Sequence, residues 1–251
     1  MDRVVLDISD GVAKITLNTP DTYNALTKEM IEDLSGAFSS IEEDPSAVVT
    51  VVTGAGKAFA AGADISTFLT SDQESSRAMS KLGQKVYERI AGSKTAVIAA
   101  VNGAAFGGGL ELAACSDIRL ASEKAKFGAQ EAAWGLLPGW GGTQRLPWLV
   151  GRSNAMKILL TGDIFDADDA YRMGLVSDVY PPDEFMDKVE GLAKKIARNG
   201  PDNIYYIKRC VSEGASYTTS AGLALENESL GLCFLKGIPK QRAETFLNKK
   251  K

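Results

Sequence analysis

The chain has 251 residues and a formal net charge of −4, with 45% hydrophobic and 24% charged residues. This length and composition are typical of a folded globular protein with a sizeable core, and they exclude disordered, collagenous and coiled-coil chains. The acidic balance gives no sign of a nucleic-acid or anionic-membrane surface, so we expect neither partner.

The absence of histidine narrows the chemistry most. It excludes Ser-His-Asp and Cys-His nucleophilic machinery and histidine-ligated metal sites, so we expect no metal. Any acid-base catalysis must use Asp, Glu, Lys, Tyr or Cys. The three cysteines are widely spaced and form no CxxC motif, which predicts reduced thiols and a cytoplasmic protein; they are Cys115, Cys210 and Cys233. The first residues lack the apolar stretch of a signal peptide.

The first elements are a hairpin and a helix. Residues 3–8 and 12–17 alternate apolar and polar side chains around Asp10-Gly11, which predicts two antiparallel strands joined by a tight turn. Residues 27–43 predict a helix with Thr27 as its N-cap. Its apolar side chains recur at helical spacing and form one buried face, made of Met30, Ile31, Leu34, Phe38 and Ile41.

Two buried strands of parallel type follow, at 47–54 and 95–103. A loop at 55–66 and a polar helix at 73–90 separate them, and three glycines and a helix to about Cys115 come after the second strand. Further short strands are predicted at the end of this half and beyond it, at 117–122, 125–131 and 174–181.

The rest of the chain is mainly helical. From Gly142 onward helical patterns prevail, and after Gly200 no segment has a strand signal. Strands that alternate with helices, followed by helices alone, predict an α/β core with a helical C-terminal region. We place the boundary between them at 199/200, with the core domain at 1–199 and the helical region at 200–251.

Glycine-rich segments follow both buried strands. The first, at 54–62, is not a nucleotide-binding loop, because Gly56-Lys57 is followed by Ala58 where a Walker motif needs Ser or Thr. A tight strand-to-helix turn is the plain interpretation of each segment. However, both segments lie at the carboxyl ends of strands, where α/β proteins bind ligands. Two such loops can each offer a backbone N–H to one oxygen, which makes an oxyanion hole.

Two glutamates near these loops are candidate acid-base groups. Glu111 follows the three glycines at the start of a helix, where the helix dipole also favours an acid for purely structural reasons. Glu131 comes twenty residues later in an apolar, glycine-rich segment, which raises the pKa of a carboxyl and suits a general acid. Asp64 and Asp117 compete with them, but each adjoins a turn or strand start, where Asp commonly binds local backbone.

The segments AFAAGADI, VNGAAFGGGLELAACSDIRLAS and KFGAQEAAWGLLPGWGGTQRLPWLVG resemble the enoyl-CoA hydratase/isomerase (crotonase) superfamily, as do ITLNTPDTYNALT and LTGDIFDADDAYRMGLVSDVYP. The resemblance spans nearly the whole chain in the family's order. It implies a core of repeated β-β-α turns in a spiral and a C-terminal α-helical trimerisation region. It also implies a homo-oligomer, usually a hexamer built as a dimer of trimers, that acts on acyl-CoA with no cofactor beyond the substrate's own coenzyme A.

The resemblance also implies roles for individual residues. Ala63 and Gly108 match the two N–H donors that hold the thioester oxygen as it becomes an enolate. Glu111 matches the residue that orients and deprotonates the water added at Cβ, and Glu131 matches the residue that protonates Cα. The positions that match coenzyme A contacts are Ala61 with its flanking loop residues Asp64 and Ile65, and Lys249 from a neighbouring subunit. The implied activity is hydration of an enoyl-CoA to a 3-hydroxyacyl-CoA, or the reverse dehydration.

Two departures and two alternatives accompany this interpretation. Gln130 stands where the family commonly has Pro, and Trp140 stands where it has a small residue. Trp140 and Trp134 either pack the core or line the acyl pocket, and in the second case they favour a short-chain or a cyclic or dienoyl acyl group. An alternative enzyme is a Δ3,Δ2-enoyl-CoA isomerase that uses mainly Glu131. A non-catalytic acyl-CoA-binding protein is the alternative of another class.

Overall fold

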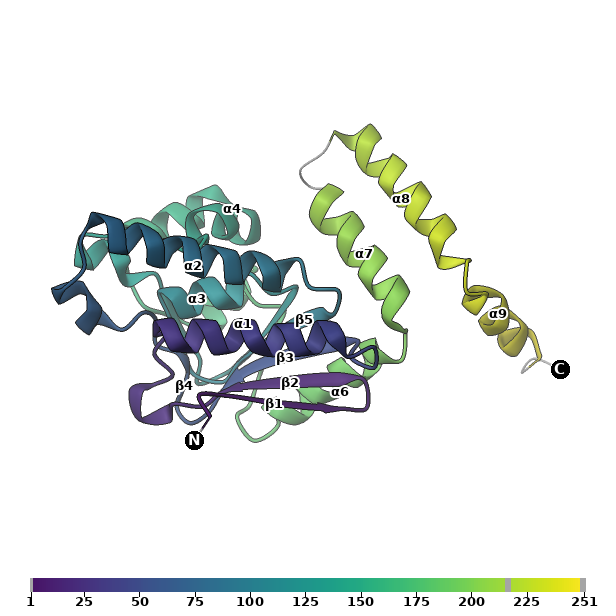
Figure 1. The fold of residues 1–251 in the computed structure, drawn as a ribbon, viewed down its shortest axis with the longest axis horizontal. Helices are drawn as coiled ribbons and strands as arrows, with labels where there is room; N and C mark the ends of the chain where they lie inside the picture. The colour runs from purple at the N-terminus through teal and green to yellow at the C-terminus, as the bar shows by residue number, and fades with distance from the viewer. Residues whose placement is uncertain (1, 215–217, 249–251) are drawn as a thin grey trace.

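The strands form a larger and a smaller sheet in the computed structural model, which describes residues 2–214 and 218–248 (Figure 1). The larger sheet has the strand order β1 (Val4–Ser9), β2 (Val12–Leu17), β3 (Val49–Gly54), β5 (Ala96–Val101), β7 (Ile118–Ser122) and β10 (Asp178–Tyr180). The smaller sheet has the order β4 (Ala58–Ala60), β6 (Ala104–Phe106), β8 (Lys126–Gly128) and β9 (Phe165–Asp166).

One unit repeats along the core: a strand in the larger sheet, a strand in the smaller sheet, then a helix. β3 and β4 lead through the 3₁₀ helix η2 (Ile65–Leu69) into α2 (Gln73–Ala91), and β5 and β6 lead into α3 (Gly108–Ala114). β7 and β8 lead through η3 (Gln130–Trp134) into α4 (Gly142–Thr161). Equivalent strands pair in parallel within each sheet. This is the predicted α/β spiral of β-β-α turns, so that prediction is confirmed.

The first elements also form as predicted. β1 and β2 pair antiparallel, and Asp10 and Gly11 at the turn both have positive φ, as a tight hairpin turn requires. Pro20–Thr22 form the short helix η1, and α1 (Lys28–Glu43) begins after Thr27, whose side chain accepts the Met30 N–H. All five predicted apolar side chains of this helix are buried.

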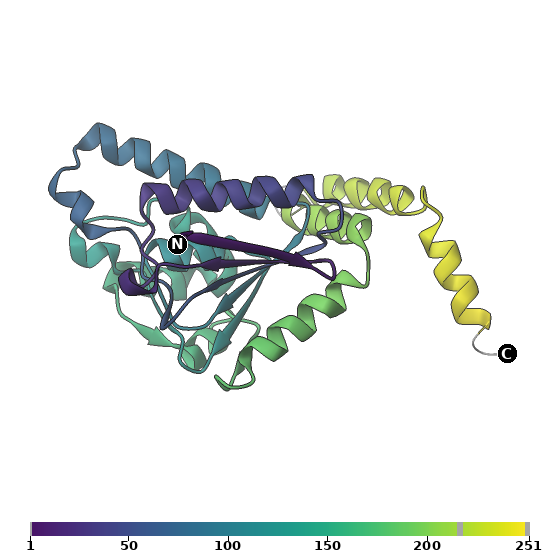
Figure 2. The same ribbon diagram turned by 60° about the horizontal axis from the view of Figure 1, so that its bottom comes forward.

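Helices cover both faces of the larger sheet, which explains why β3 and β5 are buried along their whole length. On one face, Val49, Val51 and Ile98 pack against Phe185 and Val189 of α6 (Phe185–Ala197). On the other face, the main core includes buried side chains of α1, α2 and α3. Figure 2 shows α1 and α6 on opposite sides of the sheet. The short α5 (Ala167–Arg172) follows β9.

The C-terminal region is helical, as predicted, and consists of α7 (Pro201–Gly214), α8 (Thr219–Cys233) and α9 (Ile238–Asn248). These helices extend away from the core on one side (Figures 1 and 2). Lys208 of α7 ties the region to the core, because its Nζ lies 2.8 Å from Asp117 Oδ2 and donates to the Thr95 carbonyl oxygen. The role in trimerisation and the domain boundary at 199/200 stay predictions. Among the helices of the described chain, none has the length and apolar character needed to span a bilayer.

Three local predictions were incomplete. The loop predicted at 55–66 contains β4, and the segment before the three glycines contains β6. Both strands have only three residues, too few for a periodic pattern to appear. The strand predicted at 125–131 is shorter, and Glu131 lies on η3 instead. β8 therefore ends at Gly128, and the carboxylate sits on a helical turn beyond the sheet.

Candidate active site

The peptides that carry the Ala63 and Gly108 N–H groups are both held in a fixed orientation. The Leu26 N–H donates to the Gly62 carbonyl oxygen at 2.8 Å, and the Glu111 N–H donates to the Gly107 carbonyl oxygen at 3.0 Å. Because a trans peptide directs its N–H opposite to its C=O, these bonds also orient the N–H of Ala63 and of Gly108. The Gly108 N–H begins α3 and so has no acceptor within its own helix.

The two loops touch each other, as expected from the pairing of β4 with β6. A methyl group on Gly62 would lie 2.9 Å from the Phe106 carbonyl oxygen and 3.7 Å from the Gly108 nitrogen. Gly108 itself leaves no space for a side chain, since a Cβ there would lie 2.4 Å from Trp140 Cζ3. Close packing on both sides of the loop thus explains why glycines stand here despite the backbone conformational entropy that they lose on folding.

Glu111 is buried on α3 and is held by backbone. Its Oε1 accepts the N–H of Trp140 at 2.8 Å and the N–H of Gly142 at 2.7 Å. Burial raises the pKa of Glu111 to about 7, although these two N–H groups oppose the shift. Both bonds fall on one oxygen, so Oε2 can still accept a hydrogen bond from a water molecule.

Glu131 lies on η3 with its carboxyl against the glycine loop. A Cβ on Gly107 would lie 3.2 Å from Glu131 Oε1. Its Oε2 is buried and has no hydrogen-bond partner among the described residues. Burial raises the pKa of this carboxyl, as the apolar sequence around it predicts. A protonated Glu131 would place its proton beside the same loop that carries the Gly108 N–H.

The charge of Glu131 acts on Glu111 and further raises its pKa. Their surroundings differ, because Glu111 accepts two backbone N–H groups whereas Glu131 accepts none at Oε2. Backbone donors favour the charged form of a carboxyl, and a dry site without donors favours the neutral form. The arrangement can therefore provide one base and one acid beside two N–H donors.

The competing acids have structural roles. Asp64 caps η2 by accepting the Ser66 N–H at 2.9 Å, a local backbone bond of the predicted kind. Asp117 accepts the Val97 N–H of the neighbouring strand at 2.7 Å, as well as pairing with Lys208. Asp117 therefore lies away from the glycine loops, whereas Asp64 directly follows Ala63 in the first loop.

The positions predicted to contact coenzyme A lie close to the first loop. The Ala61 N–H donates to the Tyr23 carbonyl oxygen, Asp64 caps η2, and Ile65 at the start of η2 is 54% exposed. Lys249 falls outside the described residues. A contact between these positions and coenzyme A stays a prediction.

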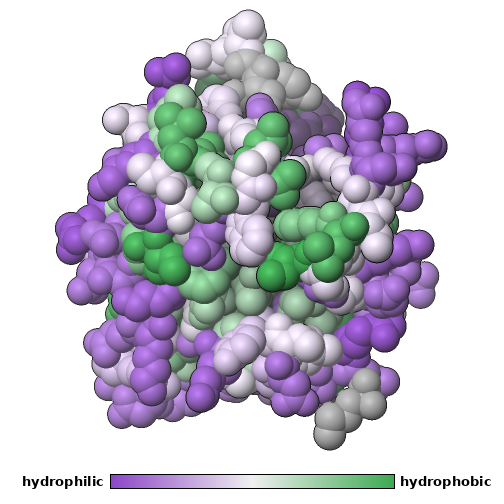
Figure 3. All heavy atoms as spheres, turned by 90° about the vertical axis from the view of Figure 1, so that its left-hand side faces the viewer, coloured by the Kyte–Doolittle hydropathy of each residue, from purple (hydrophilic) through white to green (hydrophobic). Residues whose placement is uncertain are grey.

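The two predicted pocket tryptophans have opposite environments. Trp140 is buried, with its ring edge-to-face against Tyr87 at 5.6 Å between ring centroids. Trp134 is 59% exposed. Figure 3 looks onto the side where η2 leads into α2 and shows apolar side chains gathered at its centre. Large exposed apolar residues in η2 and near η3 are Ile65, Phe68, Leu69, Trp134, Leu136 and Leu137.

Several residues of the site have no signal of their own in the sequence. The N–H groups of Trp140 and Gly142 hold Glu111, and the Tyr87 hydroxyl donates to the Gly108 carbonyl oxygen at 2.8 Å. The sequence marks Trp140 by its indole and not by its backbone N–H. The one available signal for Tyr87 was its place on the apolar face of a helix, which predicts burial but no polar partner.

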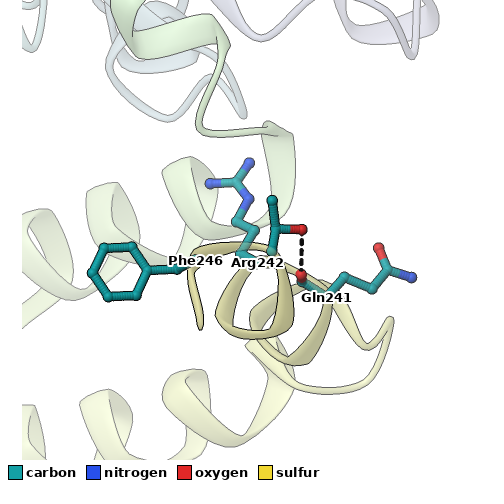
Figure 4. A pocket seen from close by; sticks show the side chains of 4 residues that line it. Gln241, Arg242 and Phe246 are labelled. Atoms are coloured by element: carbon teal, nitrogen blue, oxygen red, sulfur yellow. Dashed lines mark hydrogen bonds between the residues drawn. The ribbon is translucent and has the colours of Figure 1, made fainter. Parts of the chain in front are cut away.

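A hollow of about 390 Å³ lies elsewhere, along α9, and is lined by Gln241, Arg242, Thr245 and Phe246 (Figure 4). Within it the Thr245 hydroxyl donates to the Gln241 carbonyl oxygen. None of these four residues is a carboxylate, so the hollow offers no acid or base of the kind found at the glycine loops.

Comparison with known proteins gives a family for this arrangement. The family model described as Enoyl-CoA hydratase/isomerase matches residues 7–251. The crotonyl-CoA hydratase of Syntrophomonas wolfei is 38% identical over 251 residues, which covers 100% of this chain and 96% of that protein. The short-chain-enoyl-CoA hydratase of Clostridium acetobutylicum is also 38% identical, over 100% of this chain and 97% of that protein.

A solved structure agrees with the sequence comparisons. The crystal structure of an enoyl-CoA hydratase from Bacillus anthracis superposes with a TM-score of 0.92 at 33% identity, covering 97% of this chain and 96% of that chain. The match extends over the β-β-α core and the C-terminal helices alike, because almost the whole of both chains is included.

Proposed function

Because this chain belongs to the enoyl-CoA hydratase/isomerase family, we propose that it adds water across the α,β double bond of an enoyl-CoA thioester. The product is a 3-hydroxyacyl-CoA, and the same site catalyses the reverse dehydration. The observation that carries the proposal is the proximity of the buried Glu111 carboxyl to the partly buried Glu131 carboxyl, which lies against the glycine loop that begins the helix of Glu111.

In the proposed reaction, the ionised Glu111 accepts a proton from a water molecule as the water oxygen bonds to Cβ. The electron pair of the double bond moves toward the thioester carbonyl, whose oxygen is held by the N–H groups of Ala63 and Gly108. Glu131 then donates its proton to Cα as the enolate collapses. Before the next turnover, Glu111 has to release the proton it accepted and Glu131 has to take one up, which solvent can mediate.

The environments of the two carboxyls support this division of roles. Glu111 accepts two backbone N–H groups, which lower its pKa, but burial has the larger effect and raises that pKa to about 7, so Glu111 is the charged base above about pH 7. Glu131 has a buried oxygen without a donor, which favours the neutral acid. Since both pKa values are raised, activity falls at low pH as Glu111 becomes protonated and at high pH as Glu131 ionises.

We propose a short acyl chain as the substrate. Trp140 fills the space against Gly108, where a Cβ would already collide with its ring. An indole in that place limits how far an acyl chain can extend beyond the thioester. Two relatives are named for crotonyl-CoA and for short-chain enoyl-CoA. A cyclic or dienoyl group, which stacks on an indole, is the second possibility for the acyl part.

We also propose that the chain works as a homo-oligomer, a dimer of trimers assembled through its C-terminal helices. Exposed large apolar residues of α8, α9 and their connection support this, since many such side chains on one helical region favour contact with another chain; they include Leu230, Phe234, Leu235, Phe246 and Leu247. Three cysteines without disulfide partners support a cytoplasmic location.

The test is loss of the conjugated-thioester absorbance when the protein is added to enoyl-CoA substrates. We expect wild type to hydrate crotonyl-CoA with a much higher kcat/KM than a ten-carbon enoyl-CoA. Glu111→Gln and Glu131→Gln should each lower kcat by about 100-fold or more, because each removes an acid-base group. Glu123→Gln, at an exposed position, is the matched control.

Three outcomes would contradict parts of this proposal. Wild type inert toward every enoyl-CoA tested would reject hydration. Full activity in both glutamine variants would reject the two-carboxyl mechanism. Isomerisation of a Δ3-enoyl-CoA that survives Glu111→Gln but not Glu131→Gln would favour the isomerase, which needs mainly one carboxyl.

A further inference from the structure

Arg145 of α4 contacts the turn that holds Glu111. Its Nη1 donates to the Trp140 carbonyl oxygen at 3.1 Å, and its Nη2 lies 2.6 Å from Glu88 Oε1 of α2. The Arg145 side chain is 17% exposed, whereas that of Glu88 is 74% exposed. The guanidinium is therefore anchored at the surface and reaches inward to the turn.

Residues 140–142 form this turn, and it is held from both sides. On the inner side, the N–H groups of Trp140 and Gly142 donate to Glu111. On the outer side, Arg145 binds the Trp140 carbonyl oxygen and lies over Gly141, where a Cβ would be 2.1 Å from Nη1. Gly141 has a φ of +110°, a conformation that favours glycine.

We propose that Arg145 is a positioning residue for Glu111. Its guanidinium holds the 140–142 turn in the one conformation that presents two N–H groups to the carboxylate, and it supplies the positive charge on that side of the site. The kinetic part of this inference rests on the proposed hydration, whereas the effect on the Glu111 carboxyl does not depend on any substrate.

The charged and titratable groups around Glu111 come from several elements. Glu131 faces it from η3 and Arg145 from α4, while the buried Tyr87 of α2 and Cys115 at the end of α3 lie close by. After burial, the Gly142 and Trp140 N–H groups act most strongly on the pKa of Glu111 and lower it. Glu131 raises this pKa and Arg145 lowers it, so Arg145 is the positive side chain that opposes burial.

Two conservative variants separate the charge of Arg145 from its geometry. Arg145→Gln retains a donor for the Trp140 carbonyl oxygen but has no charge. Arg145→Lys retains the charge but cannot bridge Trp140 and Glu88 with a planar fork. Arg89→Gln is a matched control, because Arg89 of α2 also pairs with a carboxylate, Glu42 at 2.7 Å, and donates to a backbone carbonyl oxygen, that of Ser35.

The experiment titrates the Glu111 carboxyl by ¹³C NMR in the full chain without substrate, with the signal assigned by Glu111→Gln. We expect Glu111 to titrate at higher pH in Arg145→Gln than in wild type, at an intermediate pH in Arg145→Lys, which keeps the charge but loosens the turn, and at the wild-type pH in Arg89→Gln. With crotonyl-CoA, kcat should fall about tenfold in both Arg145 variants with little change in KM, because the base is misplaced.

An unchanged Glu111 titration in Arg145→Gln overturns the inference, as does a wild-type kcat in both Arg145 variants. If wild type fails to hydrate any enoyl-CoA, the proposed function is rejected, and the titration alone then decides whether Arg145 acts on Glu111.

Discussion

At the scale of single residues, the protein places two glutamates in environments that separate their chemistry. Glu111 is buried but accepts two backbone N–H groups, while a buried oxygen of Glu131 has no partner among the described side chains and backbone. Both environments are costly for a charged carboxylate, and the protein accepts this cost at its candidate site.

The cost predicts a pH-dependent effect of Glu111→Gln on stability. The folded pKa of about 7 lies above the ordinary value of 4.5. The protonated Glu111 therefore makes its full contribution to the free energy of unfolding below about pH 4.5. This contribution is lost as the pH rises through about 7. The difference corresponds to about 3 kcal/mol of unfolding free energy at pH 8, which the neutral glutamine avoids.

Urea denaturation at pH 5 and pH 8, at one protein concentration, measures this effect. Glu111→Gln should be more stable than wild type at pH 8 and similar to it at pH 5. Glu123→Gln should match wild type at both. Equal pH dependence in wild type and Glu111→Gln would show that burial of Glu111 has no such cost.

At the scale of elements, α2 supports both halves of the site with adjacent residues. Tyr87 donates to the Gly108 carbonyl oxygen, and Glu88 pairs with Arg145, which binds the turn beneath Glu111. The Trp140 ring fills the space between them and packs against Gly83 of α2 as closely as against Gly108. A displacement of α2 would therefore move the oxyanion donor and the base together.

Tyr87→Phe tests this support by removing a single hydroxyl. We expect a loss of about 1 kcal/mol in unfolding free energy, the usual contribution of one hydrogen bond. We also expect a lower kcat with an unchanged KM, because the Gly108 loop is less firmly held. Thermal unfolding and crotonyl-CoA kinetics measure the two effects. Tyr171→Phe, at a residue 56% exposed, should change neither, and a wild-type Tm for Tyr87→Phe would refute the support.

At the scale of the whole molecule, the C-terminal helices are fastened to the core by a few polar contacts and by Ile204 of α7, which packs against the core. Lys208 joins α7 to Asp117, and Arg242 of α9 donates to the Arg198 and Asn199 carbonyl oxygens at the end of α6. The apolar side chains of α8 and α9 remain largely exposed beyond these contacts. The polar contacts fix where the C-terminal helices leave the core, and the exposed apolar side chains give them a surface for another chain. Both features support the proposed assembly.

Leu235→Glu tests the assembly, since Leu235 is 76% exposed between α8 and α9. Light scattering after size-exclusion chromatography should give a hexamer for wild type and a smaller species for the variant, because a charge would be buried in the contact. Val5→Glu, on β1 at the far edge of the larger sheet, should leave the mass unchanged. A monomeric wild type would reject the assembly.

Local patterns in the sequence predicted much of the fold. The hairpin around Asp10-Gly11, the apolar face of α1 and the C-terminal helices depend on neighbours in the chain, and all formed as predicted. The three-residue strands β4 and β6 did not have enough residues to show a period. They pair only because β3 and β5 bring them together, so their existence was a consequence of the larger sheet.

The sequence by itself determined which residues are candidates for the chemistry. Glu111, Glu131 and the glycine loops belong to distinctive segments, and the absence of histidine left carboxylates as the leading acid-base groups. Only the tertiary structure decided what surrounds them. The Trp140 and Gly142 N–H groups are 29 and 31 residues from Glu111 along the chain. A backbone N–H is common to every residue except proline, so no side-chain pattern marks the ones that a fold brings to a buried carboxylate.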